Sequence, residues 1–169
     1  TNTPEFGTGA NTRNLVFGVT GNPFDSAKTC GGSSGGSAVA LATGMAPLAS
    51  GSDFGGSLRT PAGFCGVAGF RPSPGVVPSE KRPVGLSPFS VLGSMGRTIS
   101  DAALLLSAQV SIDLRDPFSV DLDPALLDPL VPADLGSVRA AISVDLGNAP
   151  MSGAYRDIFK ARSDMFRSV

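Results

Sequence analysis

The stretch "CGGSSGGSAVALATGMAPLASGSDFGGSLRTPAGFCG", residues 30–66, holds two glycine clusters that carry serine, GGSSGG and GGS. Between them, residues 37–45 are almost all small or apolar, which predicts a helix that is buried on most of its surface. Residues 46–53 have the pattern of a short interior strand that ends in polar residues, and residues 59–66 predict one or two further helical turns. Strands that alternate with helices in this way indicate an α/β layer architecture.

The segments on either side of this stretch add shorter elements. Residues 1–32 are rich in Asn, Thr, Gly and Pro, which favours loops and brief edge strands. Residues 66–70 predict another strand, and the proline-rich residues 71–93 predict a long ordered loop. Thr98 and Asp101 then have the spacing of a capping box ahead of the helix "DAALLLSAQV".

The C-terminal part of the chain predicts a connector, a strand and a helix. Residues 113–132 are acidic and rich in proline, as expected of a connector. Residues 137–145 alternate apolar and other side chains, which predicts a strand, and residues 152–169 space their apolar side chains as one helical face. The apolar faces consist of Val138, Ala140, Ile142 and Val144 in the strand, and of Tyr155, Ile158, Phe159, Phe166 and Val169 in the helix.

Composition and charge exclude several classes of protein. Thirteen basic and fourteen acidic residues give a net charge of -1 without a basic run, so a nucleic-acid or anionic membrane surface is disfavoured. The apolar stretches fall short of the roughly 18 to 20 residues of a membrane span, and there is no signal-peptide pattern. We expect a soluble, cytoplasmic protein. Cys30 and Cys65, in a chain without histidine, do not make a usual zinc set and are expected to be buried packing groups.

The serine of the first cluster has two interpretations. Residues 31–35 match G-x-S-x-G, the sharp turn that exposes the nucleophile of α/β hydrolases, although this pattern is loose in a glycine-rich chain. The chain has no histidine to take the proton of a nucleophilic serine. Either the serines are structural, as helix caps, or a buried lysine acts as base while a second serine relays the proton. Ser34 and Ser37 are expected to be local capping hydroxyls.

The second cluster has the features of an oxyanion hole. Its paired glycines lack Cβ atoms, which lets several backbone N–H groups turn toward one point at a helix start. Loss of one donor from such a hole raises a reaction barrier by about 2.7–4 kcal/mol. Asp53 and Arg59 flank the turn and are expected to pair across it in a structural role, with binding of a substrate carboxylate by Arg59 as the alternative. Phe6, Phe17 and Phe24 are expected to pack in the core or at its rim, with an acyl-binding role as the alternative.

These motifs resemble the amidase signature family. In that family GGSSGG is followed, 24 residues after its first serine, by the serine of a G-S/T-D-x-G-G-S-x-R-x-P segment, and Ser33 and Ser57 have this separation. The segment "GSDFGGSLRTPAGFCGVAGFRPSPG" matches the family almost throughout. The resemblance extends from "TNTPEFGTGANTRN" through "GSMGRTISDAALLL" to the terminal helix, and so covers essentially the whole chain.

The resemblance implies part of an α/β/α sandwich with a mixed sheet, and a Ser-cisSer-Lys amidohydrolase. By position, Ser57 would be the nucleophile and Ser33 the serine that follows a cis peptide bond, while the oxyanion hole would consist of the amides of Phe54, Gly55, Gly56 and Ser57. Such an enzyme cleaves a carboxylic amide to an acid and ammonia or an amine through a serine acyl-enzyme. The resemblance implies a small-molecule amide as substrate and no metal or organic cofactor. The charge balance and the short apolar stretches already disfavour directly bound nucleic acid and a membrane, and homo-oligomer formation is left open.

The catalytic lysine is where the chain departs from the family pattern. In the family it lies farther upstream of the first serine motif than this chain reaches, and none of Lys28, Lys81 and Lys160 lies in a matching segment. We therefore expect residues 1–169 to be the central segment of an amidase signature domain, without its lysine-bearing N-terminal part and its C-terminal part. Alone, this fragment is expected to hydrolyse amides barely or not at all.

Two other functions compete with a free-standing amidase. The amidotransferase subunit that feeds ammonia to glutamyl-tRNA shares the same serines, but "GFRPSPG" differs from the "GLKPTYG" expected of it, which favours the free-standing enzyme. The missing lysine favours a non-catalytic scaffold, which would keep the fold and bind a ligand or partner in the cleft that serves as the active site in the enzymes.

Overall fold

The structure is a computed structural model that describes residues 1–80 and 86–167. The chain divides into two compact units, Thr1–Leu130 and Val131–Val169. None of the helices in the described residues is long and apolar enough to cross a membrane. The serine motifs lie in the first unit.

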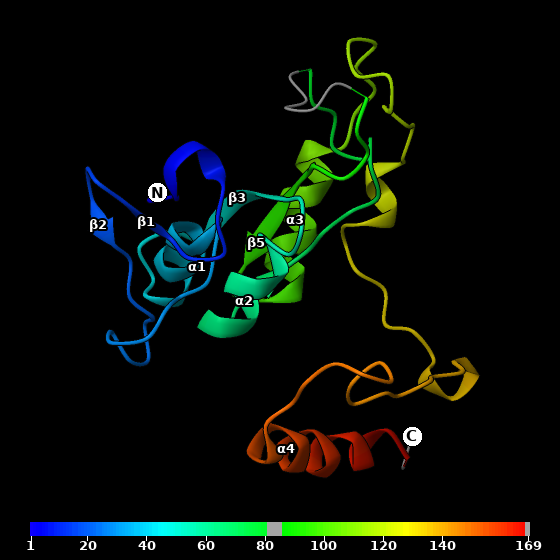
Figure 1. Cartoon of the computed structure of the whole chain (residues 1–169). Coiled ribbons are helices and arrows are strands. Elements are labelled where there is room, and N and C mark those ends of the chain that lie inside the picture. Colours follow the sequence, from blue (N-terminus) through cyan, green and yellow to red (C-terminus); the bar gives the residue numbers. More distant parts are fainter. Residues whose placement is uncertain (81–85, 168–169) are drawn as a thin grey trace. The chain divides into compact units, whose positions relative to one another are not determined.

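The first unit is built on a three-stranded antiparallel sheet (Figure 1). The strands are β3 (Leu48–Asp53), β5 (Val91–Gly96) and β4 (Ala68–Gly69), in the order β3-β5-β4. Leu48 is opposite Gly96 and Asp53 is opposite Val91, so β3 pairs along its whole length. The predicted strands of residues 46–53 and 66–70 are confirmed, although the second is only two residues long.

Helices cover both faces of this sheet, which confirms the α/β architecture. A Cβ atom on Gly51 would meet Leu58 and Ser34, so this face of β3 is turned toward α1 (Gly35–Ala42) and the start of α2 (Arg59–Cys65). The neighbouring residue Ser50 faces the other way, since its hydroxyl accepts a hydrogen bond of 2.9 Å from the side chain of Gln109 at the end of α3 (Ile99–Gln109). The core between the sheet and the first two helices consists of Cys30, Ala38, Leu41, Leu58, Ala62, Cys65 and Met95.

The predicted capping box forms at the start of α3. The Thr98 hydroxyl accepts a hydrogen bond of 3.1 Å from the Asp101 amide, and the Asp101 carboxylate accepts one of 3.0 Å from the Thr98 amide. These two bonds satisfy donors that the first turn of the helix leaves free. The helix therefore begins at Ile99, two residues before the predicted start.

The N-terminal segment packs directly against α1. It carries a short 3-10 turn, η1 (Glu5–Gly7), and a hairpin of two brief strands, β1 (Arg13–Asn14) and β2 (Gly18–Val19), as the sequence predicts. A Cβ atom on Gly35 would collide with the Thr12 side chain, and one on Gly36 would collide with the backbone of Asn2. The second glycine pair of GGSSGG therefore allows this close approach.

Two predictions for the secondary structure are wrong. Residues 91–93 belong to β5 and not to a loop, because the segment lies between two other strands that pair with its backbone. Residues 137–145 form no strand, because no described strand of the second unit pairs with them. Ala140, Ile142 and Val144 of this segment line a hollow beside α4 (Gly153–Ser163) instead.

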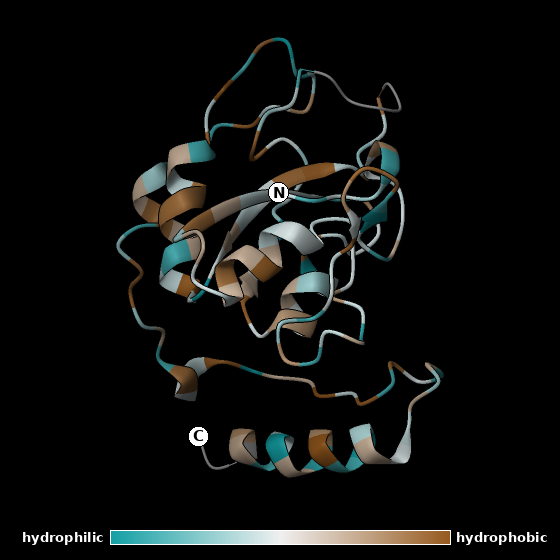
Figure 2. Ribbon diagram, turned by 90° about the vertical axis from the view of Figure 1, so that its left-hand side faces the viewer, coloured by the Kyte–Doolittle hydropathy of each residue, from teal (hydrophilic) through white to brown (hydrophobic). Residues whose placement is uncertain are grey.

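The helix predicted for residues 152–169 begins as expected but ends earlier. Ser152 caps α4 by accepting a hydrogen bond of 3.3 Å from the Tyr155 amide. A 3-10 turn, η4 (Asp164–Arg167), follows, and Val169 lies outside the described residues. Figure 2 shows hydrophobic and hydrophilic residues alternating along α4. Two short 3-10 turns precede α4 in the chain: η2 (Pro124–Leu126) within the connector and η3 (Leu135–Ser137) after it.

Candidate active site

The two serine motifs meet at one cavity. Ser33 lies just before α1 and Ser57 just before α2, and the Ser34 amide joins the two loops by donating a hydrogen bond of 3.2 Å to the Ser57 carbonyl oxygen. Ser33, Ser57, Phe54 and Gly55 all line a cavity of about 560 Å³ within the first unit. The fold therefore brings together the two serines that the sequence predicts as catalytic.

The hydroxyls of the first motif differ in what they bind. Ser34 Oγ donates to the Ser52 carbonyl oxygen and accepts from the Ser52 amide, both at 3.3 Å. Ser37 Oγ donates to the Ser50 carbonyl oxygen at 3.1 Å. The hydroxyl of Ser33, by contrast, makes no hydrogen bond within residues 1–80 and 86–167. Ser33 alone of these three has a hydroxyl that is free to act on a ligand.

The prediction that Ser34 and Ser37 are local caps is wrong. Ser34 occupies the N-cap position of α1, but its side chain makes no capping bond. Both serines bind the backbone of β3, which is an edge strand of the sheet. The polar groups on the outer side of an edge strand need partners, and these two hydroxyls supply them.

The backbone around Ser33 is held by Thr12, which sequence reasoning missed. The peptide bond between Gly32 and Ser33 is cis, as the resemblance implies for this serine. Thr12 is 1% exposed, and its hydroxyl donates to the Gly31 carbonyl oxygen at 2.9 Å and accepts from the Gly35 amide at 3.1 Å. Because Thr12 binds both ends of the loop, it fixes the position of Ser33. Its only signal in the sequence is its place in the N-terminal segment that resembles the family.

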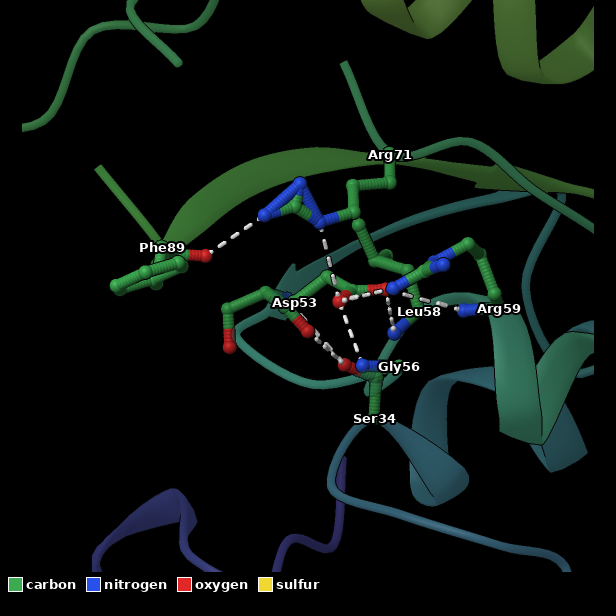
Figure 3. Close-up of polar contacts among 8 residues, drawn as sticks. Ser34, Asp53, Gly56, Leu58, Arg59, Arg71 and Phe89 are labelled. Carbon is green, nitrogen blue, oxygen red and sulfur yellow. Dashed lines mark hydrogen bonds and ion pairs between the residues drawn. The ribbon is translucent and has the colours of Figure 1, made fainter. Parts of the chain in front are cut away.

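The loop that carries Ser57 is organised by a buried carboxylate (Figure 3). Asp53, at the end of β3, is fully buried and accepts hydrogen bonds from the Gly56 amide at 2.7 Å and the Leu58 amide at 3.2 Å. Arg59 donates to both carboxylate oxygens, from Nε at 3.0 Å and from Nη2 at 3.1 Å. The predicted pairing of Asp53 with Arg59 is therefore found in the structure.

Arg71 is a second partner of this carboxylate, which sequence reasoning missed. Its Nε lies 3.3 Å from Asp53 Oδ1, and its Nη2 donates a hydrogen bond of 2.9 Å to the Phe89 carbonyl oxygen (Figure 3). Arg71 thereby ties the Ser57 loop to the segment that leads into β5. Its signal was the arginine of "GFRPSPG", which lies in the segment interpreted as a loop.

The Asp53 carboxyl group is ionised at neutral pH. Burial by itself raises its pKa, but the hydrogen bonds from the Arg59 side chain and from the Gly56 and Leu58 amides outweigh burial and lower the pKa to about 2. The loop between β3 and α2 is thus held around a buried negative charge that two arginines compensate.

The four amides predicted to form an oxyanion hole are not equivalent. The Gly56 N–H is already bound to Asp53. The N–H groups of Phe54, Gly55 and Ser57 donate no hydrogen bond to any residue that the structure describes. The arrangement therefore has three amides available for a developing negative charge, and Gly56 supports the loop instead.

The described lysines do not line this cavity. Lys28 pairs with Asp25 at 3.2 Å in an exposed loop, and Lys160 lines the hollow beside α4 in the second unit. Neither is among the residues that line the serine cavity. Lys81 lies outside the described residues.

Comparison with known proteins identifies the family. A family model described as Amidase matches residues 1–165. The chain belongs to the amidase family. It is 47% identical over 154 residues to one of the subunits of glutamyl-tRNA(Gln) amidotransferase from Thermus thermophilus, a match that covers 89% of this chain and 32% of the relative. The chain thus spans about a third of the length of this curated relative.

Solved structures of amidases have the same fold. A bacterial aryl acylamidase of the amidase signature family is 42% identical, with a TM-score of 0.68, and the match covers 72% of this chain and 25% of that one. A 6-aminohexanoate cyclic dimer hydrolase, solved in complex with its substrate, is 34% identical with a TM-score of 0.67 over 72% of this chain and 26% of that one.

The two cysteines of this amidase-family chain are packing groups, as the sequence predicts. Cys30 is 0% exposed and Cys65 is 1% exposed, and the Cys65 thiol donates to the Cys30 carbonyl oxygen at 3.7 Å. Burial raises the pKa of both thiols. The pKa of Cys65 rises to about 11, mainly because the thiol is buried and in smaller part because Cys30 lies nearby. Few thiolates form at neutral pH, and the thiolate is the reactive species.

Alkylation of the native protein at pH 8 is therefore expected to leave Cys30 and Cys65 unmodified. Iodoacetamide for one hour, followed by peptide mass spectrometry, should show less than about a tenth of the modification found for the same peptides in 6 M guanidinium chloride. Rapid alkylation of either cysteine in the folded protein would contradict the buried position of its thiol.

Proposed function

We propose that this protein hydrolyses a carboxylic amide through a serine acyl-enzyme, with Ser57 as the nucleophile. The observation that carries the proposal is that Ser57 and Ser33 line one cavity together with amide N–H groups that have no partner in the described residues. A nucleophile beside free donors is the arrangement that acyl transfer requires.

The reaction follows from these groups. Ser57 Oγ bonds to the carbonyl carbon while its proton passes through Ser33 Oγ toward a base. The amides of Phe54, Gly55 and Ser57 donate to the oxyanion of the tetrahedral intermediate. When the intermediate collapses, the C–N bond breaks and the amine leaves with a proton. A water molecule then attacks the acyl-enzyme, and the carboxylic acid is released.

The reaction also needs a base that accepts the proton from Ser33. Residues 1–169 would be the serine-bearing central segment of an amidase signature domain, and the base would be a lysine from another part of the protein. The support is that the chain spans about a third of its curated relative and that neither Lys28 nor Lys160 lines the cavity. The proposal includes a cytoplasmic location and a small-molecule amide as substrate, as the sequence predicts.

The curated relative favours a second candidate function. Its name is that of an amidotransferase component, so the same serines in this chain would release ammonia from an amide within an assembly of several subunits. Copurification of the intact protein with partner subunits, together with activity that depends on glutamine, would favour this candidate over the free-standing amidase.

A serine-directed fluorophosphonate tests whether Ser57 is a nucleophile. We expect the intact protein to form one phosphonyl adduct, which peptide mass spectrometry places on Ser57, because an activated hydroxyl reacts far faster than an ordinary one. Ser57→Ala should abolish the adduct. Ser100→Ala, which changes an exposed serine on α3, should leave labelling unchanged. A protein that is folded but not labelled at Ser57 would be a non-catalytic binding scaffold.

A further inference from the structure

The Arg71 side chain connects three segments at one end of the sheet. Strands β3 and β4 are both antiparallel to β5, so both run toward the start of β5. Asp53 ends β3, Arg71 lies just after β4, and Phe89 lies just before β5. Arg71 Nε lies 3.3 Å from Asp53 Oδ1, and Arg71 Nη2 donates to the Phe89 carbonyl oxygen at 2.9 Å (Figure 3). Arg71 therefore ties the buried carboxylate to the backbone that enters the central strand.

The two arginines that pair with Asp53 come from different places. Arg59 is the first residue of α2, directly after the Ser57 loop, so it belongs to the turn that it stabilises. Arg71 lies beyond α2, and its side chain is 22% exposed, against 56% for Arg59. A partner from outside the loop fixes the loop relative to the sheet. The contacts of Arg71 are made within the first unit, so they do not depend on the part of the protein that would supply the base.

The carboxylate oxygen that Arg71 contacts is the one that holds Gly56. Asp53 Oδ1 accepts a hydrogen bond of 2.7 Å from the Gly56 N–H. Gly56 has a φ of +119°, which glycine adopts readily because it lacks a Cβ atom. The peptide group before Gly56 carries the N–H that Asp53 binds, and the peptide group after it carries the Ser57 N–H. A shift of Asp53 Oδ1 would therefore turn the Ser57 amide and move the Ser57 hydroxyl.

We infer that Arg71 is a positioning residue for acyl transfer: by holding Asp53 Oδ1 from outside the loop, it sets the direction of the Ser57 N–H and hydroxyl. This inference rests on the proposed function and adds a residue to its site. Arg71 does not line the serine cavity, so it acts through the geometry of the reactive groups and not by contact with substrate. A displacement of about 1 Å in such groups lowers a rate by about 100-fold.

Saturation kinetics of fluorophosphonate labelling of the intact protein test this role. The phosphoryl oxygen of the probe would take the place of the oxyanion, so the maximal rate reports on the Ser57 hydroxyl and the amides, and the half-saturating concentration reports on binding. Arg71→Met removes both contacts and should lower the maximal rate by about 30- to 100-fold while changing the half-saturating concentration less than about threefold. Arg71→Lys keeps the charge, but one ammonium group cannot serve both Asp53 and Phe89, so the maximal rate should fall by about tenfold.

Combination with Asp53→Asn shows whether Arg71 acts through the carboxylate. An arginine that works through Asp53 has little effect once the charge is gone, so adding Arg71→Met to Asp53→Asn should change the maximal rate less than about threefold. A purely structural arginine would lower the thermal midpoint and leave the labelling rate of the folded protein unchanged. The rates are therefore compared at least about 15 °C below the thermal midpoint of each variant.

Arg115→Met is the matched control, because Arg115 also pairs with a carboxylate of the first unit, that of Asp113, and does not line the serine cavity. It should leave labelling unchanged. A maximal rate for Arg71→Met within about twofold of wild type, or an equal loss with and without Asp53→Asn, would overturn the inference and leave Ser57 as the nucleophile. If Arg71→Met does not fold, Arg71→Lys decides, since wild-type labelling of that variant overturns the inference. If the wild type is not labelled at Ser57, the proposed function itself fails.

Discussion

Ser57→Ala is expected to lower kcat for amide hydrolysis by the intact protein by about 10⁴- to 10⁶-fold, because no acyl-enzyme forms without the hydroxyl. A small residual rate should remain, because the free amides of Phe54 and Gly55 still stabilise an oxyanion that water forms. KM should change little, since the missing bond is made only in the transition state and in the intermediate. Steady-state ammonia release from benzamide measures both constants.

Stability measurements separate this effect from misfolding. The Ser57 hydroxyl makes no hydrogen bond within residues 1–80 and 86–167, so its removal should shift the thermal midpoint by no more than about 1 °C. Ser34→Ala is the informative comparison, because the Ser34 hydroxyl makes two hydrogen bonds to the Ser52 backbone. This variant should lower the thermal midpoint more than Ser57→Ala does, and it should lower kcat far less. If Ser57→Ala kept more than a tenth of the activity of the wild type, Ser57 would not be the nucleophile.

Features that depend on neighbours in the chain could be predicted from the sequence. The capping box joins Thr98 to Asp101, three residues away, and Asp53 pairs with Arg59, six residues away. Short separations of this kind leave the backbone few arrangements, so residue type and spacing are informative. The spacing of Ser33 and Ser57 indicated the shared cavity only through the resemblance to a known family.

Features that depend on distant backbone could not be predicted. The segment of β5 contains two glycines and a serine, which disfavour strands, yet it pairs with β3 and β4 on its two sides. Ser34 binds a strand residue 18 positions away, which no helix-capping pattern encodes. The alternation in residues 137–145 is the reverse case, because a strand-like pattern forms no strand without a partner.

Asp53→Ala is expected to lower the free energy of unfolding at pH 7 by about 3–5 kcal/mol, which is typical of removing one member of a buried ion pair. The substitution takes away the acceptor of the Gly56 and Leu58 amides and leaves two arginines without their partner. Urea unfolding of the intact protein, followed by circular dichroism, measures the change. Asp53→Asn keeps the size of the side chain and isolates the loss of charge.

The stabilisation by Asp53 should depend on pH in a defined window. Its pKa is about 2 in the folded protein and lies near the ordinary 3.8 when unfolded, so the unfolded state takes up the proton first as the pH falls. The carboxylate therefore contributes fully above about pH 4, and roughly 2 kcal/mol of stability is lost as the pH falls from about 4 to 2. The difference in stability between the wild type and Asp53→Asn should shrink over this range. Asp25→Asn, which removes an exposed carboxylate paired with Lys28, should show no comparable change. An equal difference between wild type and Asp53→Asn at pH 7 and pH 2.5 would mean that the buried carboxyl group is not ionised in the fold, and that the arginines are held by other groups.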